Sequence, residues 1–265
     1  MCTLIAGVEV LGPRTLVLGA NRDESPKRAA AGPGVLRERP RVVGGRDLEA
    51  GGTWLAVREA LAVTALMNRR PNPAAAAAAE GKALRSRGLL CLDAAAAGWA
   101  SDAPARIDPG TGERHPRRLH AALGLIERDT YGPCTLVGLN LDEPSWAMLA
   151  ETGVETGIRI LERGWNVVTH ADVNDRNEPR TRWLLDRLER FWPIHVAEAL
   201  EGIASLLAAH EDPDHGVPGV CLHRERFPTV SSTLIAIGGM GPKRYLHAAG
   251  APCTTPYEAF TELLE

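Results

Sequence analysis

Residues 2–24 read CTLIAGVEVLGPRTLVLGANRDE, which is two apolar runs of strand length joined at a turn signal. Both runs are rich in leucine and β-branched residues, and Leu11-Gly12-Pro13 between them predicts a short β-hairpin. With the turn centred near its glycine, Cys2 faces the end of the second run across the ladder, at roughly 5 Å. The hairpin therefore predicts that Cys2 lies beside Asn21, Arg22 and Asp23.

Cys2 follows the initiator methionine, which is normally excised before so small a residue. Its removal leaves one residue with both a thiol and a free α-amine, a nucleophile with its own base. Their reference pKa values are about 8.5 and about 7.7–8.0, so proton exchange between them is nearly thermoneutral. A nearby guanidinium would favour the thiolate, and a carboxylate such as Asp23 could orient the ammonium. The structural alternative is that Cys2 fills an edge of the core.

The composition is that of a soluble globular chain. It has 265 residues, of which 45% are hydrophobic and 24% charged, and the net charge is −3. This net charge does not indicate the basic surface that nucleic-acid binding requires. No apolar stretch reaches the roughly 20 residues that span a bilayer. We expect one domain over residues 1–265, a cytoplasmic location and a small-molecule partner. The oligomeric state does not follow from the sequence.

The cysteines predict reduced thiols and no zinc site. Five are present, an odd number, widely spaced and without a CxxC pair. The stretch from His210 to His215 contains five residues able to bind metals. Because it follows a predicted helix and contains a proline, a solvated helix stop is the favoured interpretation and a metal site the alternative.

A second hairpin is predicted from Thr53–Val57 and Ala60–Leu66, around Arg58-Glu59. It brings Asn68 to the edge formed by Gly51-Gly52. Glycines there allow close approach of backbone or ligand, or serve a turn that needs positive φ. Trp54 is expected in the core or in the lining of a pocket.

The remaining pattern alternates helices with paired strands. We predict helices at Leu84–Ala97, Arg117–Arg128, Glu178–Phe191, Val196–His210 and Tyr257–Leu264, and low-complexity or loop segments at 74–79 and 101–112. We predict strands at Cys134–Leu139, Trp146–Ala150, Thr229–Ile237 and Arg244–Ala249, and a hairpin of Gly157–Leu161 with Trp165–Thr169. Antiparallel pairs with helices between them predict an α+β fold in layers, with helices outside two stacked sheets.

Seven segments together resemble the NRDE family, also called the Transport and Golgi organisation protein 2 family. They are Cys2, Asn21-Arg22-Asp23-Glu24, Gly44-Gly45-Arg46-Asp47, Gly51-Gly52-Thr53-Trp54-Leu55, Asn68-Arg69, Ser86-Arg87-Gly88-Leu89 and Phe227-Pro228-Thr229-Val230-Ser231-Ser232-Thr233. That family is similar to the N-terminal nucleophile hydrolases. The resemblance implies their four-layer αββα sandwich of two antiparallel sheets.

The resemblance also implies a set of site residues. Asn21 and Asp23 match the motif of the choloylglycine hydrolase and acyltransferase branch, and Asn68 matches its oxyanion asparagine. The arginine of the motif falls on Ala20, so Arg22 would have to replace it from a position displaced along the same strand face. A later asparagine appears here as His170, and a late arginine as Val230.

Two functions follow as hypotheses. The first is an N-terminal cysteine amidohydrolase or acyltransferase for a small N-acyl compound, with Cys2, Asn21, Arg22, Asp23 and Asn68 as catalytic residues and no required cofactor or metal. Trp54 and His170 are then expected to contact substrate. The second is a binding or trafficking protein for haem or a lipid-related ligand that kept the fold and lost the chemistry. In either case His170 is a satisfied polar residue, or a ligand or acid/base group.

Overall fold

The first sheet has six antiparallel strands and contains the hairpin that begins the chain. The structure is a computed structural model that describes residues 2–70, 73, 80–97, 116–151, 156–239 and 241–265. The six strands lie side by side in the order β10 (Gly164–Val168), β1 (Thr3–Val8), β2 (Thr15–Asp23), β11 (Thr229–Gly238), β12 (Arg244–Ala248) and β13 (Glu258–Ala259). The two strands of the predicted first hairpin pair with Thr3 opposite Asn21. Glu9, Gly12 and Arg14 take positive φ in the loop between them, which closes the hairpin as expected.

The second sheet has seven antiparallel strands. They follow the order β3 (Ala30–Arg37), β4 (Val42–Asp47), β5 (Leu55–Arg58), β6 (Ala62–Asn68), β7 (Cys134–Asn140), β8 (Trp146–Ala150) and β9 (Ile158–Ile160). The predicted second hairpin is confirmed as β5 and β6, with Glu59 and Ala60 at positive φ in its turn. The pair β3 and β4 was not predicted from the sequence, because its glycines weaken the strand pattern.

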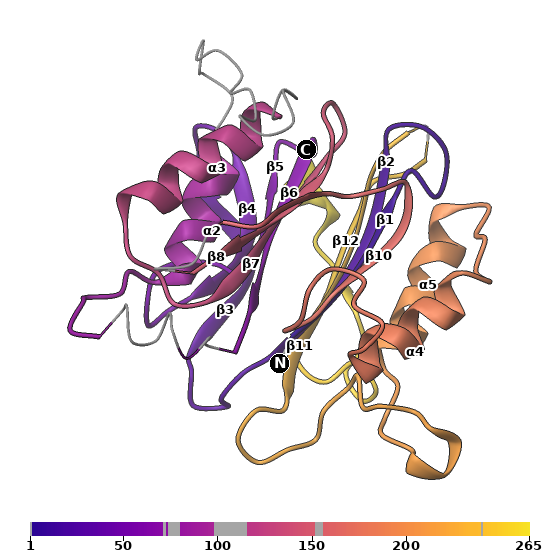
Figure 1. The fold of residues 1–265 in the computed structure, drawn as a ribbon. Coiled ribbons are helices and arrows are strands. Elements are labelled where there is room, and N and C mark those ends of the chain that lie inside the picture. Colours follow the sequence, from indigo (N-terminus) through magenta and orange to yellow (C-terminus); the bar gives the residue numbers. More distant parts are fainter. Residues whose placement is uncertain (1, 71–72, 74–79, 98–115, 152–155, 240) are drawn as a thin grey trace.

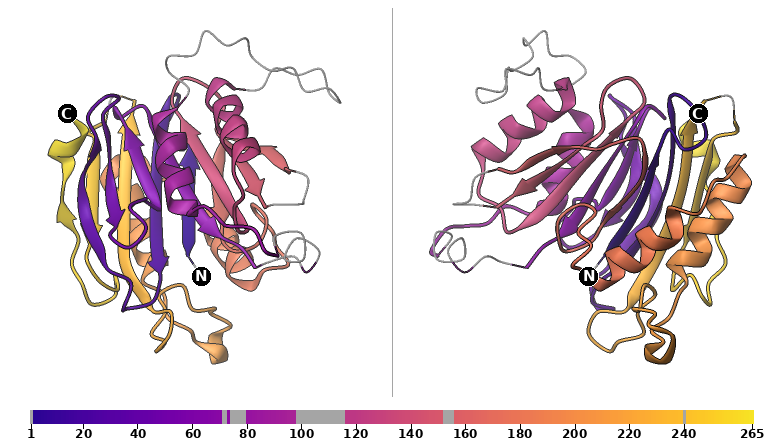
Figure 2. Two further views of the ribbon diagram at one scale, coloured as in Figure 1. Left: turned by 90° about the vertical axis from the view of Figure 1, so that its left-hand side faces the viewer. Right: turned by 45° about the vertical axis from the view of Figure 1, so that its right-hand side comes forward.

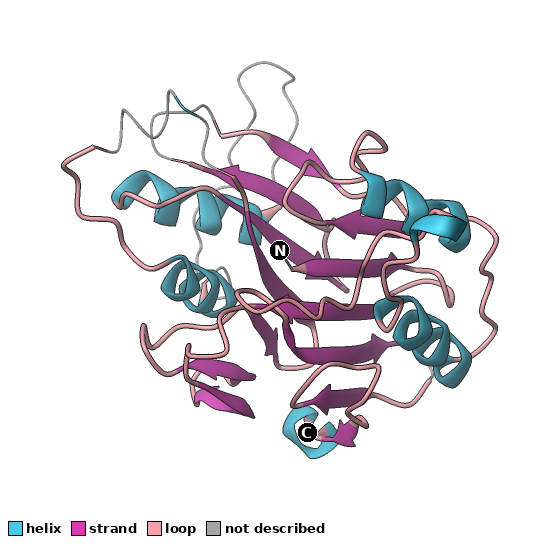
Figure 3. Cartoon of the chain, turned by 90° about the horizontal axis from the view of Figure 1, so that it is seen from below, coloured by secondary structure: helices cyan, strands magenta, loops and turns pink. Residues whose placement is uncertain are grey.

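Helices cover the outer face of each sheet, which gives four layers (Figures 1 and 2). Helices α2 (Arg87–Ala96) and α3 (Arg117–Arg128) lie on the seven-stranded sheet, and α4 (Pro179–Leu188) and α5 (Val196–Leu207) on the six-stranded one. Short 3-10 helices occupy Pro213–His215 and Thr261–Leu264. Figure 3 shows the start of the chain near the middle of the molecule, with helices on both sides. The predicted αββα sandwich is confirmed.

Four apolar clusters hold the layers together, the smallest of them between α2 and the strands β4 and β5. The largest fills the space between the sheets and includes Leu4, Leu18, Val63 and Ile235. A second lies beneath α2 and α3, and a third beneath α4 and α5. In β1 and β2 the even-numbered residues face the other sheet, whereas odd-numbered Ile5 and Val17 face the helices. This alternation decides which side chains can reach Cys2.

Two glycines permit close packing around the site. A Cβ on Gly19 would lie 2.3 Å from the Ile203 side chain, so α5 packs directly on β2 only because this side chain is absent. A Cβ on Gly52 would lie 2.2 Å from the backbone carbon of Gly88, at the start of α2. Gly51 has φ of +71°, so both predicted roles of this pair, a turn and a close backbone approach, are present.

Several sequence predictions are wrong in detail. The hairpin of Gly157–Leu161 with Trp165–Thr169 does not form: β9 pairs with β8 in one sheet and β10 with β1 in the other. The predicted C-terminal helix at Tyr257–Leu264 is instead β13, which pairs with β12, followed by a 3-10 helix. Helix α2 begins at Arg87 rather than Leu84, and α5 ends at Leu207 rather than His210. The predictions for 74–79 and 101–112 fall on segments that lie outside the described residues.

The described part of the chain has no helix long and apolar enough to cross a membrane.

Candidate active site

Strand register places Cys2 between two predicted site residues. Thr3 pairs with Asn21 and Leu4 with Val168, so one further step along β1 sets Cys2 opposite Arg22 on one side and opposite His170 on the other. The Asp23 N–H donates to the Cys2 Sγ over 3.4 Å. The prediction that Cys2 lies beside the polar end of β2 is therefore confirmed.

The Cys2 thiol faces the space between the sheets. Cys2 packs against the central core cluster, as its even position in the strand alternation requires. Arg22 shares that face, and its guanidinium lies 4.2 Å from the ring centre of Trp54, which belongs to the segment entering β5. The contact between Arg22 and Trp54 joins the two sheets next to Cys2.

The environment of Cys2 opposes ionisation of the thiol. Burial raises its pKa above the usual value, and the negative charge of Asp23 raises it further. The hydrogen bond from the Asp23 N–H and the positive charge of Arg22 lower the pKa by less. At neutral pH the thiol is therefore protonated, and a reaction that uses the thiolate needs a base within reach of the sulfur.

Asp23 holds a buried carboxylate beside Cys2. Its side chain has no exposed surface, Oδ1 accepts a hydrogen bond of 2.7 Å from the Thr229 hydroxyl, and the Arg180 Nη1 lies 3.8 Å from Oδ2. Burial raises the pKa of this carboxyl, although Thr229 and Arg180 lower it in part. Arg180 is itself fixed by a 2.9 Å hydrogen bond to the Thr3 hydroxyl. The carboxylate thus sits in a rigid polar pocket at the end of β2.

Asn21 points away from the thiol. Its Nδ2 donates to the Leu207 carbonyl over 2.8 Å and to the Val220 carbonyl over 3.1 Å, both on the helical side of the sheet. The amide therefore ties β2 to the end of α5 and to the loop beyond it. The catalytic role of Asn21 stays a prediction, and these contacts favour a positioning role.

Asn68 ends β6, where the register turns its backbone N–H toward Gly52. The backbone N–H groups at this end of β6 point alternately to its two neighbouring strands. The Arg69 N–H donates to the Pro133 carbonyl on the β7 side, and the Leu66 N–H donates to the Trp54 carbonyl on the β5 side. The N–H of even-numbered Asn68 therefore points to the β5 side. Outside the strand ladder, Asn68 makes no backbone hydrogen bond among the described residues. An available backbone donor at this strand end matches what an oxyanion requires.

His170 lies where β10 ends and is close to the end of β6. Arg69 donates to the Ala171 carbonyl over 2.9 Å and pairs with Asp172 at 2.7 Å, which brings the two strand ends together. Burial lowers the pKa of His170, and the positive charges of Arg70 and Arg180 lower it further, against the effect of Glu178. The imidazole is therefore neutral at physiological pH. Its substrate contact stays a prediction.

A cavity of 350 Å³ opens beside Arg22 and lies within the size range of small-molecule sites. Its lining includes Arg22, Arg28, Trp54, Ser231 and His247. Trp54 therefore packs against the central core and lines this cavity, so both of its expected placements occur together. The cavity offers two guanidinium groups and an aromatic face to a ligand.

His247, in this cavity wall, should make stability depend on pH. It is 5% exposed, its Nδ1 lies 3.0 Å from the Thr233 hydroxyl, and burial lowers its pKa from 6.5 to about 4. The unfolded chain then binds the proton more readily, so stability is full above pH 6.5 and falls as the pH drops from 6.5 toward 4. The expected loss of folding free energy is about 3 kcal/mol.

Chemical unfolding across this pH range should show a smaller loss of stability for His247→Gln. The exposed-site control His215→Gln should behave as wild type, and equal pH dependence in all three proteins would contradict the assignment.

Thr229 and Arg180 were missed in the sequence as partners of Asp23. Thr229 stands in the segment 227–233 that resembles the family strand, which was a usable signal. Arg180 lies in the first turn of α4, and nothing in its local pattern points to Asp23.

A group of cysteines and histidines able to hold a metal ion lies on neighbouring loops, at His210, Cys221, His223 and Cys253.

Comparisons with known proteins agree with this architecture. The family model described as Transport and Golgi organisation 2 matches residues 1–236. The Caenorhabditis elegans N-acylethanolamine-hydrolyzing acid amidase ortholog is similar in structure, with TM-score 0.52, 11% identity, and 89% of this chain and 92% of that one covered. A conjugated bile acid hydrolase variant from Clostridium perfringens has TM-score 0.46 and 10% identity, with coverage of 98% and 97%. No curated protein sequence gave a significant match. At 11% identity the amidase ortholog shows a shared fold and not a shared activity.

Proposed function

The chain belongs to the Transport and Golgi organisation 2 family, and we propose that it is an N-terminal cysteine amidohydrolase or acyltransferase that acts on a small N-acyl compound. The observation that carries the proposal is the placement of Cys2. Cys2, which directly precedes β1, faces the space between the sheets, with Arg22 and His170 opposite it in the register and the Asp23 backbone hydrogen-bonded to its sulfur. The fold shared with the amidase ortholog is compatible with this chemistry.

Removal of Met1 would supply the base that the thiol lacks. The new α-amine, on Cys2 itself, would accept the thiol proton, and the buried Asp23 carboxylate would orient the resulting ammonium. The sulfur would then bond to the acyl carbon, the carbon–nitrogen bond would break, and the amine would leave with the proton. Water or an acceptor amine would cleave the thioester, and the proton that it loses would return to the sulfur. Each step conserves atoms and charge with groups of this site.

The developing oxyanion would be met by donors from the two strand ends beside Cys2. The Asn68 N–H at the end of β6 is directed toward Gly52 by the strand register, and His170, neutral at physiological pH, lies opposite Cys2. One such donor contributes about 10²–10³ in rate. In this proposal the backbone N–H of Asn68, rather than its side-chain amide, is the first hydrogen-bond donor to the oxyanion.

The cavity beside Arg22 is the proposed substrate site. Its size suits a small acyl or acylamino compound, and its two arginines favour a group with negative charge. The ring of Trp54 offers an apolar surface on the same wall. We therefore propose an N-acyl substrate with a carboxylate or similar anionic group.

The proposal is tested by mass spectrometry together with a substrate panel. We expect the mature chain to lack Met1 and to take one acyl label at Cys2 from an acyl-trapping electrophile, and to release amine from N-acyl amino acids faster than from uncharged amides. A chain that retains Met1, takes no label at Cys2 and turns over no compound of the panel would refute it.

Binding or trafficking of haem or a lipid-related ligand without catalysis is the second candidate function. The observation that favours it is the raised pKa of the Cys2 thiol, which disfavours the nucleophilic form. In that case haem added to the unlabelled protein should give a saturable spectral change, and His170→Ala should abolish it.

A further inference from the structure

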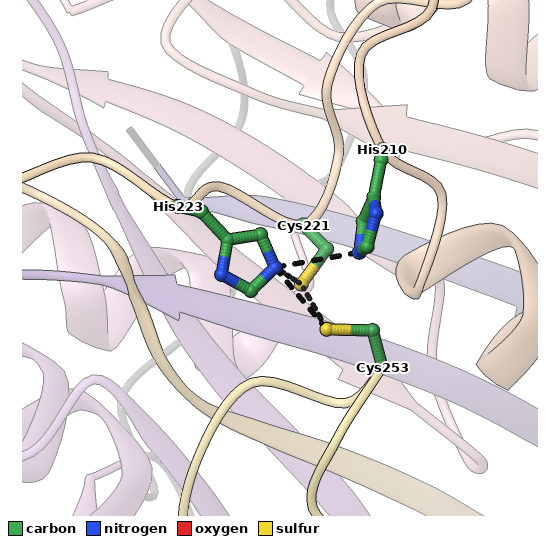
Figure 4. A group of neighbouring side chains, drawn as sticks. All are labelled: His210, Cys221, His223 and Cys253. Atoms are coloured by element: carbon green, nitrogen blue, oxygen red, sulfur yellow. Dashed lines mark hydrogen bonds between the residues drawn. The ribbon is translucent and has the colours of Figure 1, made fainter.

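Four side chains from three loop segments converge near the end of α5. His210 follows that helix, Cys221 and His223 lie on the loop before β11, and Cys253 lies in the turn after β12. Figure 4 shows their donor atoms directed toward one another. All four lie within 4.8 Å of each other. The candidate catalytic residues described above are not members of this group.

Four of the six donor–donor distances lie near those of a tetrahedral ion. A zinc ion with Zn–S bonds of about 2.3 Å and Zn–N bonds of about 2.0–2.1 Å holds two sulfurs about 3.8 Å apart, two nitrogens about 3.3 Å apart and sulfur from nitrogen about 3.6 Å apart. The two Sγ atoms here are 3.5 Å apart and the two Nε2 atoms 3.3 Å apart. The Nε2 of His223 lies 3.8 Å from the Cys221 sulfur and 3.2 Å from that of Cys253, values on either side of the ideal.

Hydrogen bonding alone does not account for this arrangement. The Nε2 of His223 has three close neighbours, the Nε2 of His210 and both sulfurs, but carries either one proton or one lone pair. A disulfide does not account for it either, because its sulfurs would be about 2.0 Å apart and both histidines would remain without a role. A cation at the common centre satisfies all four donors at once.

We propose that His210, Cys221, His223 and Cys253 form a structural site for one Zn²⁺ ion. Two thiolates and two imidazoles are a donor set that zinc prefers, and four protein ligands leave no position for water or substrate. Two thiolates also balance the charge of the ion. The sequence expectation of no zinc site rested on the absence of a CxxC pair, and this site needs no such pair.

The loops are already held in place. The Ala209 carbonyl accepts from the N–H groups of Val220 and Cys221, over 3.0 and 2.9 Å, and so fixes Cys221 beside the end of α5. We interpreted the stretch from His210 to His215 as a solvated helix stop, and the structure agrees with this in part. Asp212 caps the 3-10 helix there and bonds to His215, while His210 alone joins the cluster.

The site is linked to the buried carboxylate at the end of β2. Leu222, between two of the ligands, donates from its N–H to the Thr229 hydroxyl over 2.9 Å, and that hydroxyl donates to Asp23. Zinc would therefore fix the segment that aligns Thr229 with Asp23. The metal site itself does not depend on the proposed catalytic function.

The test is metal content measured in the folded protein. Wild-type protein produced with zinc and purified under reducing conditions should retain about one zinc per chain. Cobalt(II) should give the thiolate charge-transfer absorption of a tetrahedral site. His223→Ala and Cys253→Ser, which alter partly or fully exposed residues, should weaken binding by at least about 100-fold.

His215→Ala is the matched control, because this histidine lies on the same loop, is 79% exposed in its side chain and bonds to Asp212 outside the cluster. It should retain zinc as the wild type does, and a chelator should lower the thermal stability of both but not that of His223→Ala. Circular dichroism of each variant verifies folding. Wild type without zinc and without cobalt absorption, a mass that reveals a Cys221–Cys253 disulfide, or undiminished binding by His223→Ala would each overturn the proposal.

Discussion

Cys2→Ala should lower turnover of the N-acyl substrate by at least about 10⁴-fold, the scale on which loss of a catalytic nucleophile acts in well-studied hydrolases. The variant removes the sulfur that faces the space between the sheets. It keeps an N-terminal residue small enough for methionine excision, so the α-amine, Asp23 and the rest of the site remain. The loss then reports on the thiol alone.

Steady-state kinetics and acyl trapping should change together. Cys2→Ala should take no acyl label, while Cys2→Ser should retain a small activity because a weaker nucleophile stands at the same place. Cys91→Ala provides a matched control, since Cys91 is a buried free cysteine that bonds to the Thr64 carbonyl beneath α2. Turnover by Cys2→Ala within about tenfold of wild type would exclude the nucleophile role.

Asp23→Asn should lower turnover by about 10²- to 10⁴-fold, the effect expected when an orienting carboxylate is lost. The same change should leave thermal stability equal or higher. Burial raises the pKa of Asp23, so folding disfavours its ionised form, and a neutral amide of the same shape removes that cost. A fall in activity without a fall in stability is typical of a functional residue.

Asp142→Asn is the control, because the pKa of Asp142 is lowered in the folded protein, whereas that of Asp23 is raised. The Asp142 carboxylate pairs with Arg118 at 2.6 Å, and that interaction holds its pKa below the usual value. The side chain is 39% exposed, so its replacement should cost less than about 1 kcal/mol and leave turnover unchanged. If Asp23→Asn destabilised the protein more than Asp142→Asn and retained activity, Asp23 would be a structural residue.

The first hairpin could be predicted because its information is local. The runs before and after Gly12 are matched in length, so the register follows from counting, and Cys2 has to meet Arg22. The same reasoning failed at Gly164. The runs on either side resemble a hairpin, but β9 completes the edge of one sheet while β10 pairs with β1 in the other.

Local sequence patterns were enough to predict the position of the thiol, the layered fold and the segments that carry Asn68 and His170. Hydrogen-bond ladders between neighbouring strands and the alternation of side chains are set by spacing along the chain, so the sequence contains them. Three features became visible only in the folded chain. Asn21 turns toward α5, Arg180 and Thr229 enclose the Asp23 carboxylate, and the side chains of four further residues meet, namely His210, Cys221, His223 and Cys253. Those contacts join segments far apart in sequence, and they form because packing of α4 and α5 on the sheet closes the loops between them.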